Sequence, residues 1–560
     1  MTTSTTSPQR TRLLRLSHLH RIAARQRDLL IGLVAAVGVV VYVIAAISMD
    51  EAGFPLDDSW IHQTYARNLA EHGEWAFIPG EPSVASTSPL YTVLLSIGYV
   101  LRIPFMVWTF ALGVLALAGG GWIGVRVAER LFPDLRTVGL WTGLALVLVW
   151  HLVWAASSGM ETMLFATLSL AVVGLTWREL PERETSDRPV DAFKRGAVLG
   201  LVGALLTLTR PEGVGLVGLA GLFVLLAWPY GSLRDGWRTY VAWGAGVSLG
   251  WLVGVAPYVA VNYNLSGDLL PNTSAAKQAE NAPARELPLL ERYGRMLLPL
   301  SAGGQLLLLP GVVMALARLF HRIRHGERTA VLLLLPLAWI VMDVSAYAIR
   351  LPAPYQHGRY VIPILPHIVL YGVGGTLLIV KAGQRTPLRR VLSRSLALST
   401  LLIMVPFWVI GARAYGRDVR IINTEMVKTA KWIRDNPELV PEDELLAVHD
   451  IGAVGYYAPR PILDLAGLVS PEVVPIILDH EALMGLLRVR CARYLMVLPD
   501  QLPAEPDDHR LGPVEYDAAQ NKNVAQPLFI TNEPYAPDAG GGNMAIYQLR
   551  LEWPPECAEK

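Results

Sequence analysis

Long apolar stretches recur along the first three quarters of the chain and stop near residue 412. A helix that spans a bilayer needs about 20 apolar residues, and the repeated stretches approach or meet that length. They predict about 11 membrane-spanning helices, at 29–48, 105–125, 138–156, 159–177, 196–210, 212–228, 240–262, 297–317, 329–348, 361–381 and 396–412. The apolar run 89–101 is too short to span and predicts a re-entrant or interfacial helix.

Residues 413–560 have the mixed pattern of a soluble domain. Residues 424–436 place apolar side chains among polar ones, as an amphipathic helix does, whereas 445–449 and 493–498 contain short apolar runs typical of strands. Alternating helix and strand signals predict a small α/β domain. The stretch 501–540 is rich in Pro, Asp, Gly and Asn and is predicted to be mostly loop.

Composition supports this division. The 560 residues are 52% hydrophobic and 17% charged, against about 45–50% apolar and 25% charged in soluble proteins. We therefore predict a polytopic α-helical membrane protein with an N-terminal segment 1–28, a membrane domain 29–412 and a soluble α/β domain 413–560. The net charge of +1 gives no basic domain for nucleic acid. The first apolar run is longer than the core of a signal peptide and predicts an uncleaved span.

Lys and Arg concentrate in alternate loops, beginning with six arginines before the first span. The positive-inside rule then places the N-terminus in the cytoplasm and the loop after the first span outside it. An odd number of spans places 413–560 outside as well. Cys491 and Cys557 are the two cysteines of the chain. They would form a disulfide outside the cytosol, but two free thiols fit the sequence equally well.

Two adjacent carboxylates, Asp57 and Asp58, follow the first span at the predicted membrane surface. One of them could act as a general base toward an acceptor hydroxyl while the other tunes its pKa or binds an ion. A divalent cation beside the pair is left open, and no other cofactor is predicted. The alternative is structural, because paired acids also suit a solvated loop or the N-cap of the helix predicted from Asp58 to Ala70.

Further ionisable residues gather in loops predicted to face outward, and we take them as candidates for binding a donor and its phosphate: Arg67, Glu161, Arg210, Glu212, Lys277, His357 and Arg359. Ionisable groups close to a span are costly and are usually paired or functional. Arg offers a phosphate a bidentate fork, and Lys offers it a point charge. The alternatives are a structural ion pair of Arg210 with Glu161 or Glu212, and ordinary interface charge for the loop residues.

The tail carries a second group of polar residues. His449 and Asp450 end a predicted strand and enter a Gly-rich turn, and Asp464 follows the next apolar run. Polar residues at such positions of an α/β domain often form a loop site, which here would face an acceptor. A plain strand-to-loop turn is the alternative. The sequence contains no P-loop or HExxH motif.

Six blocks in this order carry a resemblance to a known family: DDSWIHQTYARNLAEHGEWAFIPGEPSVASTSPLYT, SGMET, TRPEG, PNTSAAKQ, HGRYVIP and HDIGAVGYYAPRPILDLAGLVS. Together they resemble the bacterial branch of the GT-C superfamily of integral-membrane glycosyltransferases, in particular proteins similar to mycobacterial arabinofuranosyltransferases and, more distantly, mannosyltransferases. The resemblance covers almost the whole chain. The first block is fairly specific, whereas SGMET and TRPEG alone are weak.

The resemblance implies transfer of a monosaccharide, with inversion, from a polyprenyl-phosphate donor to a hydroxyl of a glycan, lipid or protein at the outer face of a bacterial cell membrane. It also implies a catalytic Asp in the first outer loop, which falls on Asp57 or Asp58 with a slight preference for Asp57. Arg210, Lys277 and Arg359, with His357, would face the phosphate. The sequence lacks the WWDYG signature of oligosaccharyltransferases, and it does not identify the sugar or the acceptor.

Two other classes of function stay open. A transporter or lipid flippase would also have many spans, but its ionisable groups should lie near the bilayer midplane, often in two related halves. A non-catalytic assembly protein that binds glycolipid would keep the cationic loops without needing Asp57 and Asp58.

Overall fold

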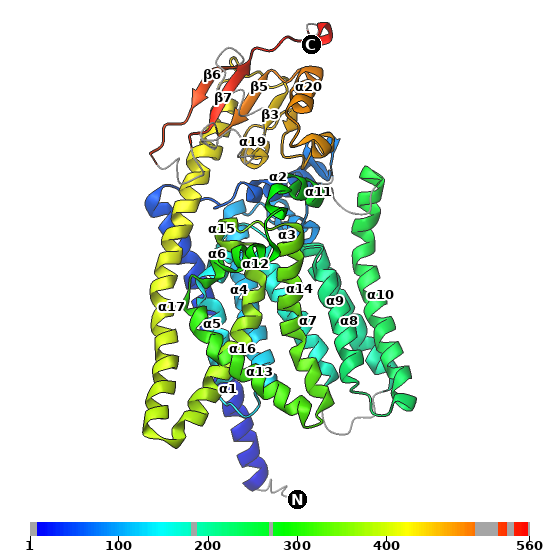
Figure 1. Ribbon diagram of the computed structural model, residues 1–560, viewed down its shortest axis with the longest axis vertical. Helices are drawn as coiled ribbons and strands as arrows, with labels where there is room; N and C mark the ends of the chain where they lie inside the picture. Colours follow the sequence, from blue (N-terminus) through cyan, green and yellow to red (C-terminus); the bar gives the residue numbers. More distant parts are fainter. Residues whose placement is uncertain are drawn as a thin grey trace, which may run out of the picture.

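The structure is a computed structural model that describes residues 8–83, 85–180, 188–267, 273–498, 525–534 and 542–557. Long helices lie roughly parallel in a bundle, and a smaller layer that contains a β-sheet covers one end of it (Figure 1). Helix α1 begins at the opposite end of the molecule. The chain is therefore a polytopic α-helical protein with a C-terminal α/β domain.

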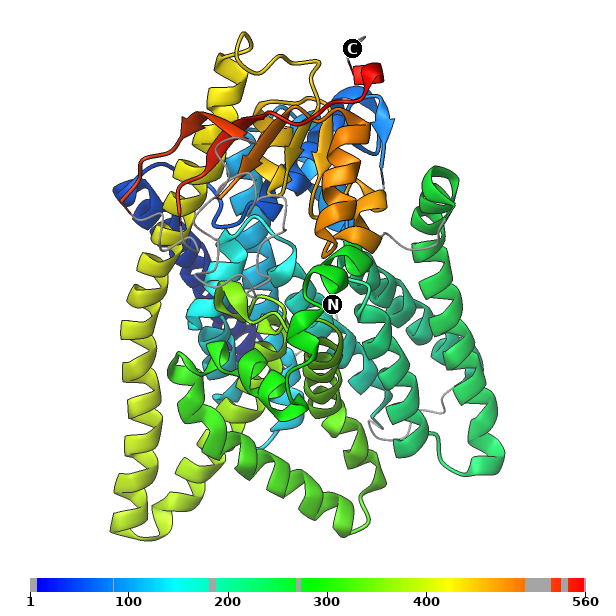
Figure 2. The same ribbon diagram turned by 45° about the horizontal axis from the view of Figure 1, so that its top comes forward.

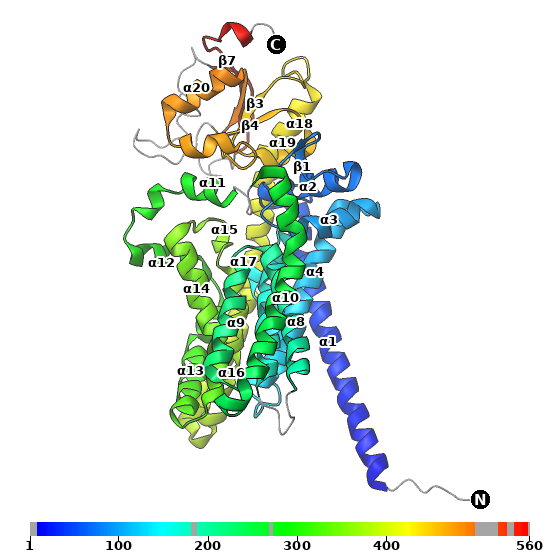
Figure 3. The ribbon, with the colours of Figure 1, turned by 90° about the vertical axis from the view of Figure 1, so that its right-hand side faces the viewer.

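The part before the tail consists of these elements: α1 (Pro8–Met49), α2 (Asp58–His72), β1 (Ala76–Ile78), β2 (Glu81–Pro82), α3 (Pro89–Val100), α4 (Phe105–Leu131), α5 (Val138–Leu148), α6 (Trp150–Ser157), α7 (Thr162–Thr176), α8 (Pro189–Thr209), α9 (Gly213–Ala227), α10 (Leu233–Ser266), α11 (Thr273–Glu280), α12 (Leu289–Leu297), α13 (Leu309–Arg324), α14 (Leu335–Arg350), α15 (Tyr355–Gly358), α16 (Leu365–Ala382) and α17 (Pro387–Ile422). Helices α2, α3 and α11 lie between the bundle and the tail (Figures 1 and 3).

Within the described ranges, eight helices are long and apolar enough to cross a membrane, or nine if the bent pair α5 and α6 forms one span. That pair bends by 56° at Val149. Two further predicted spans correspond to α7 and α9, which have 15 residues each. The chain is a multi-pass membrane protein, and the count of about 11 spans stays a prediction. The short run 89–101 forms a helix, α3.

The predicted span 297–317 is wrong at its start. Helix α12 ends at Leu297, and α13 begins at Leu309. Pro299 and Pro310 both stand at the starts of helical segments, where a missing N–H costs no hydrogen bond. These prolines and the intervening 3₁₀ turns break the apolar run, so the span is shifted toward residue 324.

Glycines bring α8 and α10 into close contact. A Cβ at Gly196 or Gly200 of α8 would lie 2.1–2.2 Å from a main-chain oxygen of α10, and one at Gly246 or Gly250 of α10 would lie 2.2–2.4 Å from one of α8. Small residues four apart on facing helices allow this approach in membranes. The contact supports α8, whose end leads directly into Arg210.

The tail begins without a break in the helix. A π-helical turn, Asn423–Val427, joins α17 to α18 (Lys428–Asp435). The remaining elements are β3 (Leu446–Val448), α19 (Ile451–Tyr457), β4 (Ile462–Asp464), α20 (His480–Arg490), β5 (Tyr494–Val497), β6 (Ala525–Ile530) and β7 (Ala545–Leu549). The sheet order is β4-β3-β5-β7-β6, with β4, β3 and β5 parallel and the β5–β7 and β7–β6 pairs antiparallel.

The two faces of this sheet pack against different partners. Leu446 and Val448 of β3 belong to a core that also includes Trp60 of α2, whereas Ala447 belongs to a core shared with α20. This alternation follows from the two-residue period of a strand. Figure 2 shows α20 in orange alongside the strands. The tail therefore shares a hydrophobic core with the loop that carries the carboxylate pair.

Three predictions about the tail meet different outcomes. The strands predicted at 445–449 and 493–498 are β3 and β5. The helix predicted at 424–436 is present but continues α17. Within the stretch 501–540, which is predicted to be mostly loop, 525–530 forms the edge strand β6, where Pro527 is tolerated. Residues 501–524 and 535–540 lie outside the described residues.

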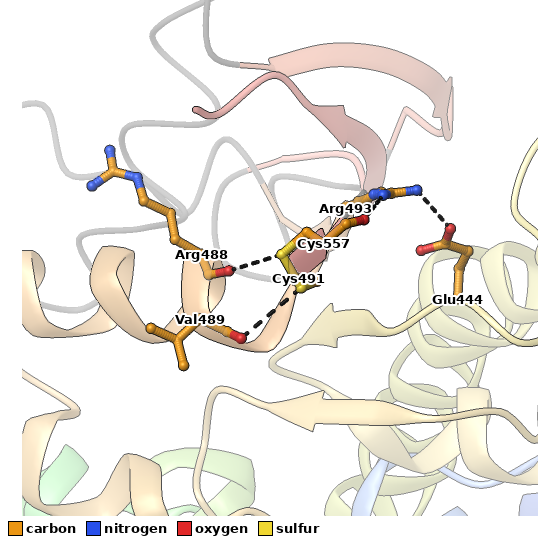
Figure 4. The surroundings of a disulfide bond; sticks show 6 residues. All are labelled: Glu444, Arg488, Val489, Cys491, Arg493 and Cys557. Atoms are coloured by element: carbon orange, nitrogen blue, oxygen red, sulfur yellow. Dashed lines mark hydrogen bonds and ion pairs between the residues drawn. A yellow bond between two sulfur atoms is a disulfide. The ribbon is translucent and has the colours of Figure 1, made fainter. Parts of the chain in front are cut away.

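Cys491 and Cys557 form a disulfide (Figure 4). It ties a 3₁₀ turn, Pro555–Cys557, to the end of α20. Arg493 donates to the carbonyl oxygen of Cys557 and, at 3.0 Å, to the carboxylate of Glu444. The two alternatives that the sequence left open are thereby resolved in favour of the disulfide.

Candidate functional site

Asp58 lies beside two cations that come from distant parts of the chain. It opens α2, and its Oδ2 accepts hydrogen bonds from Lys277 Nζ at 3.0 Å and from Arg359 Nη2 at 2.6 Å. Burial opposes ionisation of Asp58, but the charges and hydrogen bonds of the two cations outweigh it and hold the pKa of Asp58 well below its usual range. About a quarter of the Asp58 side chain is exposed. The site therefore holds an accessible, ionised carboxylate between two cations.

Arg359 is buried and incompletely paired. Its Nη2 also donates to the Tyr360 hydroxyl at 3.0 Å, but Nε and Nη1 have no hydrogen-bond partner among the described residues. Gln356 and His357, which precede Gly358 in the same loop, have φ of 54° and 59°, which is uncommon outside glycine. Backbone held in this region costs about 1–3 kcal/mol per residue and clusters at functional sites. The loop thus presents a guanidinium with free donors.

Asp57 meets the tail instead of the cations. It occupies the N-cap position of α2, but its carboxylate accepts hydrogen bonds from the main-chain N–H groups of Gly452 at 2.6 Å and Ala453 at 2.8 Å. Burial, and then the nearby charge of Asp450, raise the pKa of Asp57 to about 8 against the lowering effect of these hydrogen bonds. A Cβ at Gly452 would lie 2.1 Å from the Asp57 carbonyl oxygen, so glycine is needed for the contact.

Arg67 holds the other end of the same tail helix. It donates to the carbonyl oxygens of Tyr456 at 2.8 Å and Gly455 at 3.3 Å, and its guanidinium lies 4.6 Å from the Tyr456 ring centre. Asp57 therefore faces the N-terminal amides of α19 and Arg67 faces its C-terminal carbonyls. The acceptor oxygens of Asp57 and the cation of Arg67 both match the dipole of the helix. These partners differ from the phosphate that the sequence suggested for Arg67.

Glu161 and Arg210 form a buried ion pair, with Arg210 Nε 2.6 Å from Glu161 Oε1. Arg210 Nη2 donates to Thr162 Oγ1 at 2.8 Å, and His62 Nε2 lies 3.3 Å from Glu161 Oε2. This pair is the structural alternative that the sequence left open. Arg210 Nη1 still has no partner among the described residues.

Glu212 lies in a second buried group. Its Oε1 accepts a hydrogen bond of 2.6 Å from the Tyr347 hydroxyl. Asp343, one turn earlier on α14, is 1% exposed and interacts electrostatically with Glu212 and Arg210. The sequence analysis missed Asp343 and Tyr347. A lone carboxylate inside the predicted span 329–348 was a signal that could have found Asp343.

His357 has a partner away from Asp58. Its Nε2 lies 2.7 Å from Asp418 Oδ2, which also accepts from Trp154 Nε1 at 3.0 Å. Its ring packs edge-on against Trp150 and Trp154, each with centroids 5.2 Å apart. These contacts anchor the strained loop to α6 and α17, and they direct His357 to Asp418 where the sequence suggested a phosphate.

The three tail candidates lie in two settings. His449 Nε2 is 3.8 Å from Glu280 on α11, the helix that carries Lys277, and its Nδ1 is 3.8 Å from Asp450. Asp464 is fully buried, and its oxygens accept from the main-chain N–H groups of Ala466 and Val469 in its own turn. His449 and Asp450 therefore border the site, and Asp464 holds a turn together.

The carboxylate pair does not form a ready site for a divalent cation. Both oxygens of Asp57 accept main-chain N–H groups, and Asp58 already faces two cations. In the described part of the chain, no group of three or more His, Cys, Asp or Glu side chains is arranged to hold a metal ion.

Among known protein families, residues 413–547 match a family model described as a domain of unknown function (DUF8728). No curated protein sequence matches the chain.

Solved structures match nearly the whole chain. ArnT from Cupriavidus metallidurans, bound to undecaprenyl phosphate, is 14% identical with a TM-score of 0.56, and the match covers 92% of this chain and 97% of that one. The oligosaccharyltransferase of Archaeoglobus fulgidus, in its apo form, is 11% identical with a TM-score of 0.55 over 94% and 75% of the two chains. AglB from the same organism, in complex with an inhibitory peptide and a dolichol-phosphate, is 10% identical with a TM-score of 0.50 over 91% and 74%.

Proposed function

We propose that this chain, which has the GT-C fold, is a glycosyltransferase that moves a monosaccharide from a polyprenyl-phosphate donor to an acceptor hydroxyl. One observation carries the proposal: the fold brings Asp58, Lys277 and Arg359 together from three distant segments, and Arg359 Nε and Nη1 find no hydrogen-bond partner among the described residues. A carboxylate beside two cations is what an inverting displacement at a phosphate-linked sugar requires.

In the proposed reaction, the ionised carboxylate of Asp58 accepts the proton of the acceptor hydroxyl. The acceptor oxygen then bonds to the anomeric carbon, and the bond from that carbon to the phosphate oxygen breaks. Polyprenyl phosphate leaves with its electron pair, and Lys277 and Arg359 stabilise the charge. Arg supplies donors in a planar fork, and Lys supplies a point charge.

We assign the base to Asp58 and a positioning role to Asp57. The Asp58 side chain is about a quarter exposed and lies beside both cations, and its pKa is held low, so it is ionised at neutral pH. Asp57 is buried, has a pKa raised to about 8, and uses both oxygens on Gly452 and Ala453. This reverses the slight preference for Asp57 in the sequence analysis. Arg67, acting through α19, is a second positioning residue.

We further propose that the reaction takes place at the outer face of a bacterial cell membrane. The disulfide supports an oxidising compartment for 413–560, and α1 begins at the opposite end of the molecule. We also propose that 29–412 and 413–560 are two functional domains, although α17 runs across the boundary between them. His449 and Asp450 border α11 and would face the acceptor.

The test is turnover by purified protein. A panel of undecaprenyl-phosphate monosaccharides serves as donor, cell-envelope extract supplies the acceptor, and release of undecaprenyl phosphate is measured. Asp58→Asn should slow release about 100- to 10,000-fold, the range of a general base. Glu179→Gln, in a buried carboxylate at the other end of the bundle, is the matched control. Wild-type rates in Asp58→Asn would refute the assignment, and a larger loss in a folded Asp57→Asn protein would exchange the two roles.

A further inference from the structure

A buried polar group lies directly beside the proposed reaction site and has more hydrogen-bonding capacity than the protein uses. It comprises Arg210, Glu212, Asp343 and Tyr347. Asp343 is 1% exposed, and Arg210 and Tyr347 are each 6% exposed. Four atoms of this group have no hydrogen-bond partner within the described ranges: Asp343 Oδ1, Asp343 Oδ2, Glu212 Oε2 and Arg210 Nη1.

Such a group is unusual in a folded protein. Buried polar atoms are nearly always paired, and leaving one unpaired costs about 1–3 kcal/mol, or more for a charged group. The same protein shows that it can satisfy a comparable group. Glu179, which is also buried, accepts from Arg195 at 2.8 and 2.9 Å and from the Tyr230 hydroxyl at 2.8 Å. The unpaired atoms around Asp343 therefore point to a ligand.

Tyr360 connects this group to the proposed phosphate site. Its hydroxyl accepts from Arg359 Nη2, its ring lies 5.1 Å from that of Tyr347, and the guanidinium of Arg210 lies 6.0 Å from its ring centre. One aromatic side chain thus touches both groups. A sugar attached to a phosphate at Arg359 would be close enough to reach the residues beyond Tyr360.

We propose that Arg210, Glu212 and Asp343 form the subsite that binds the hydroxyl groups of the donor sugar, and that this sugar carries no negative charge. The inference rests on the proposed function and adds the class of sugar to it. A carboxylate can accept from two neighbouring hydroxyls, so Asp343 suits a vicinal diol. Glu212 Oε2 accepts from a third hydroxyl, and Arg210 Nη1 donates to a sugar oxygen.

Charge selects among sugars at this subsite. A uronic acid would place a third carboxylate beside Asp343 and Glu212, and like charges in a buried site are strongly disfavoured. An amino sugar would place its ammonium group beside the same two carboxylates, which attract it. A neutral hexose or pentose, or an amino sugar, therefore meets no such penalty, and its hydroxyl or ammonium groups supply the donors that the free carboxylate oxygens need.

The experiment measures binding to purified full-length protein. The probes are undecaprenyl phosphate alone and undecaprenyl phosphate carrying glucose, mannose, arabinose, glucosamine or glucuronic acid. Wild-type protein should bind at least one of the lipids that carry glucose, mannose, arabinose or glucosamine about 10-fold or more tightly than undecaprenyl phosphate, the scale of one or two hydrogen bonds to charged groups. Asp343→Asn should remove that gain and leave the affinity for undecaprenyl phosphate unchanged.

Two further variants keep the test decisive. Glu212→Gln should also remove the gain, which covers the case in which Asp343→Asn does not fold, and Glu179→Gln should retain it. Equal loss for undecaprenyl phosphate and the sugar lipids, a gain limited to glucuronic acid, or no gain in the wild type would each overturn the subsite. If Arg359→Gln binds undecaprenyl phosphate as the wild type does, the proposed function itself fails.

Discussion

Helices α7 and α8 carry a buried Glu–Arg–Tyr group at each end, and the two groups differ in one respect. At one end, Arg195 and Tyr230 donate to both oxygens of Glu179. At the other end, Arg210 binds Glu161 and Tyr347 binds Glu212, but Asp343 and parts of Arg210 and Glu212 have no hydrogen-bond partner in the part of the chain that the structure describes. The same residue types are therefore satisfied in one place and not in the other.

This difference separates a structural role from a ligand-binding one. A completed hydrogen-bond group stabilises the fold, whereas unpaired buried donors and acceptors cost stability and persist where a ligand can complete them. The incomplete end is also where Asp58, Lys277 and Arg359 meet. The contrast predicts that variants at the two ends will fail in different assays.

The largest expected effect on stability comes from a change in the completed group of Glu179, Arg195 and Tyr230. Glu179→Ala would leave Arg195 without its carboxylate, and breaking a buried pair costs about 3–5 kcal/mol. Thermal unfolding in detergent should show a clear loss of stability, with the affinity of the surviving folded protein for undecaprenyl phosphate unchanged. A Glu179→Ala protein that keeps its stability but binds undecaprenyl phosphate more weakly would contradict the structural role that the comparison assigns to this group.

At the incomplete end, Arg359→Gln and Lys277→Gln should act on binding. A hydrogen bond to a charged group is worth about 1.5–3 kcal/mol, so affinity for undecaprenyl phosphate should fall roughly 10- to 100-fold. Titration of each purified variant gives the answer, with Glu179→Gln as the control. Unchanged affinity with a lowered melting temperature would identify these cations as structural.

The contact between Asp57 and α19 should respond to a single methyl group. In Gly452→Ala the new Cβ would meet the Asp57 carbonyl oxygen at 2.1 Å, so α19 must move. Overpacking of this kind costs about 1–3 kcal/mol. We expect reduced protection of the α2 amides in hydrogen exchange and slower turnover, with binding of undecaprenyl phosphate preserved. Gly485→Ala, where no atom lies within 4 Å of the added Cβ, is the matched control.

The smallest expected effect is in the pH dependence of turnover. A base must be deprotonated, and the pKa of Asp58 is held below its usual range, so its ionisation should leave the rate nearly constant from pH 6 to 8. If Asp57 were the base, its pKa of about 8 would make the rate fall about tenfold per pH unit below 8. A pH–rate profile of wild-type protein distinguishes the two.

Sequence patterns could predict the helical membrane fold, the α/β tail and the residues that meet at Asp58, because the length of an apolar stretch and the charges in the loops between such stretches are local signals. They could not place Arg67 and His357, which bind α19 and Asp418 through contacts between distant segments. Nor could they distinguish the role of Asp57 from that of Asp58. The two residues are neighbours at the start of a helix, but their side chains bind partners from different parts of the chain. The start of the predicted span 297–317 was wrong because prolines interrupt this apolar run. Asp343 was missed because it is a single polar residue inside another apolar run.

The most direct test is a structure of the protein with undecaprenyl phosphate bound. The proposed function predicts phosphate density within hydrogen-bonding distance of Lys277 Nζ and of Arg359 Nε or Nη1, on the same side as Asp58. Phosphate density elsewhere, with Lys277 and Arg359 still bound to Asp58 alone, would contradict it.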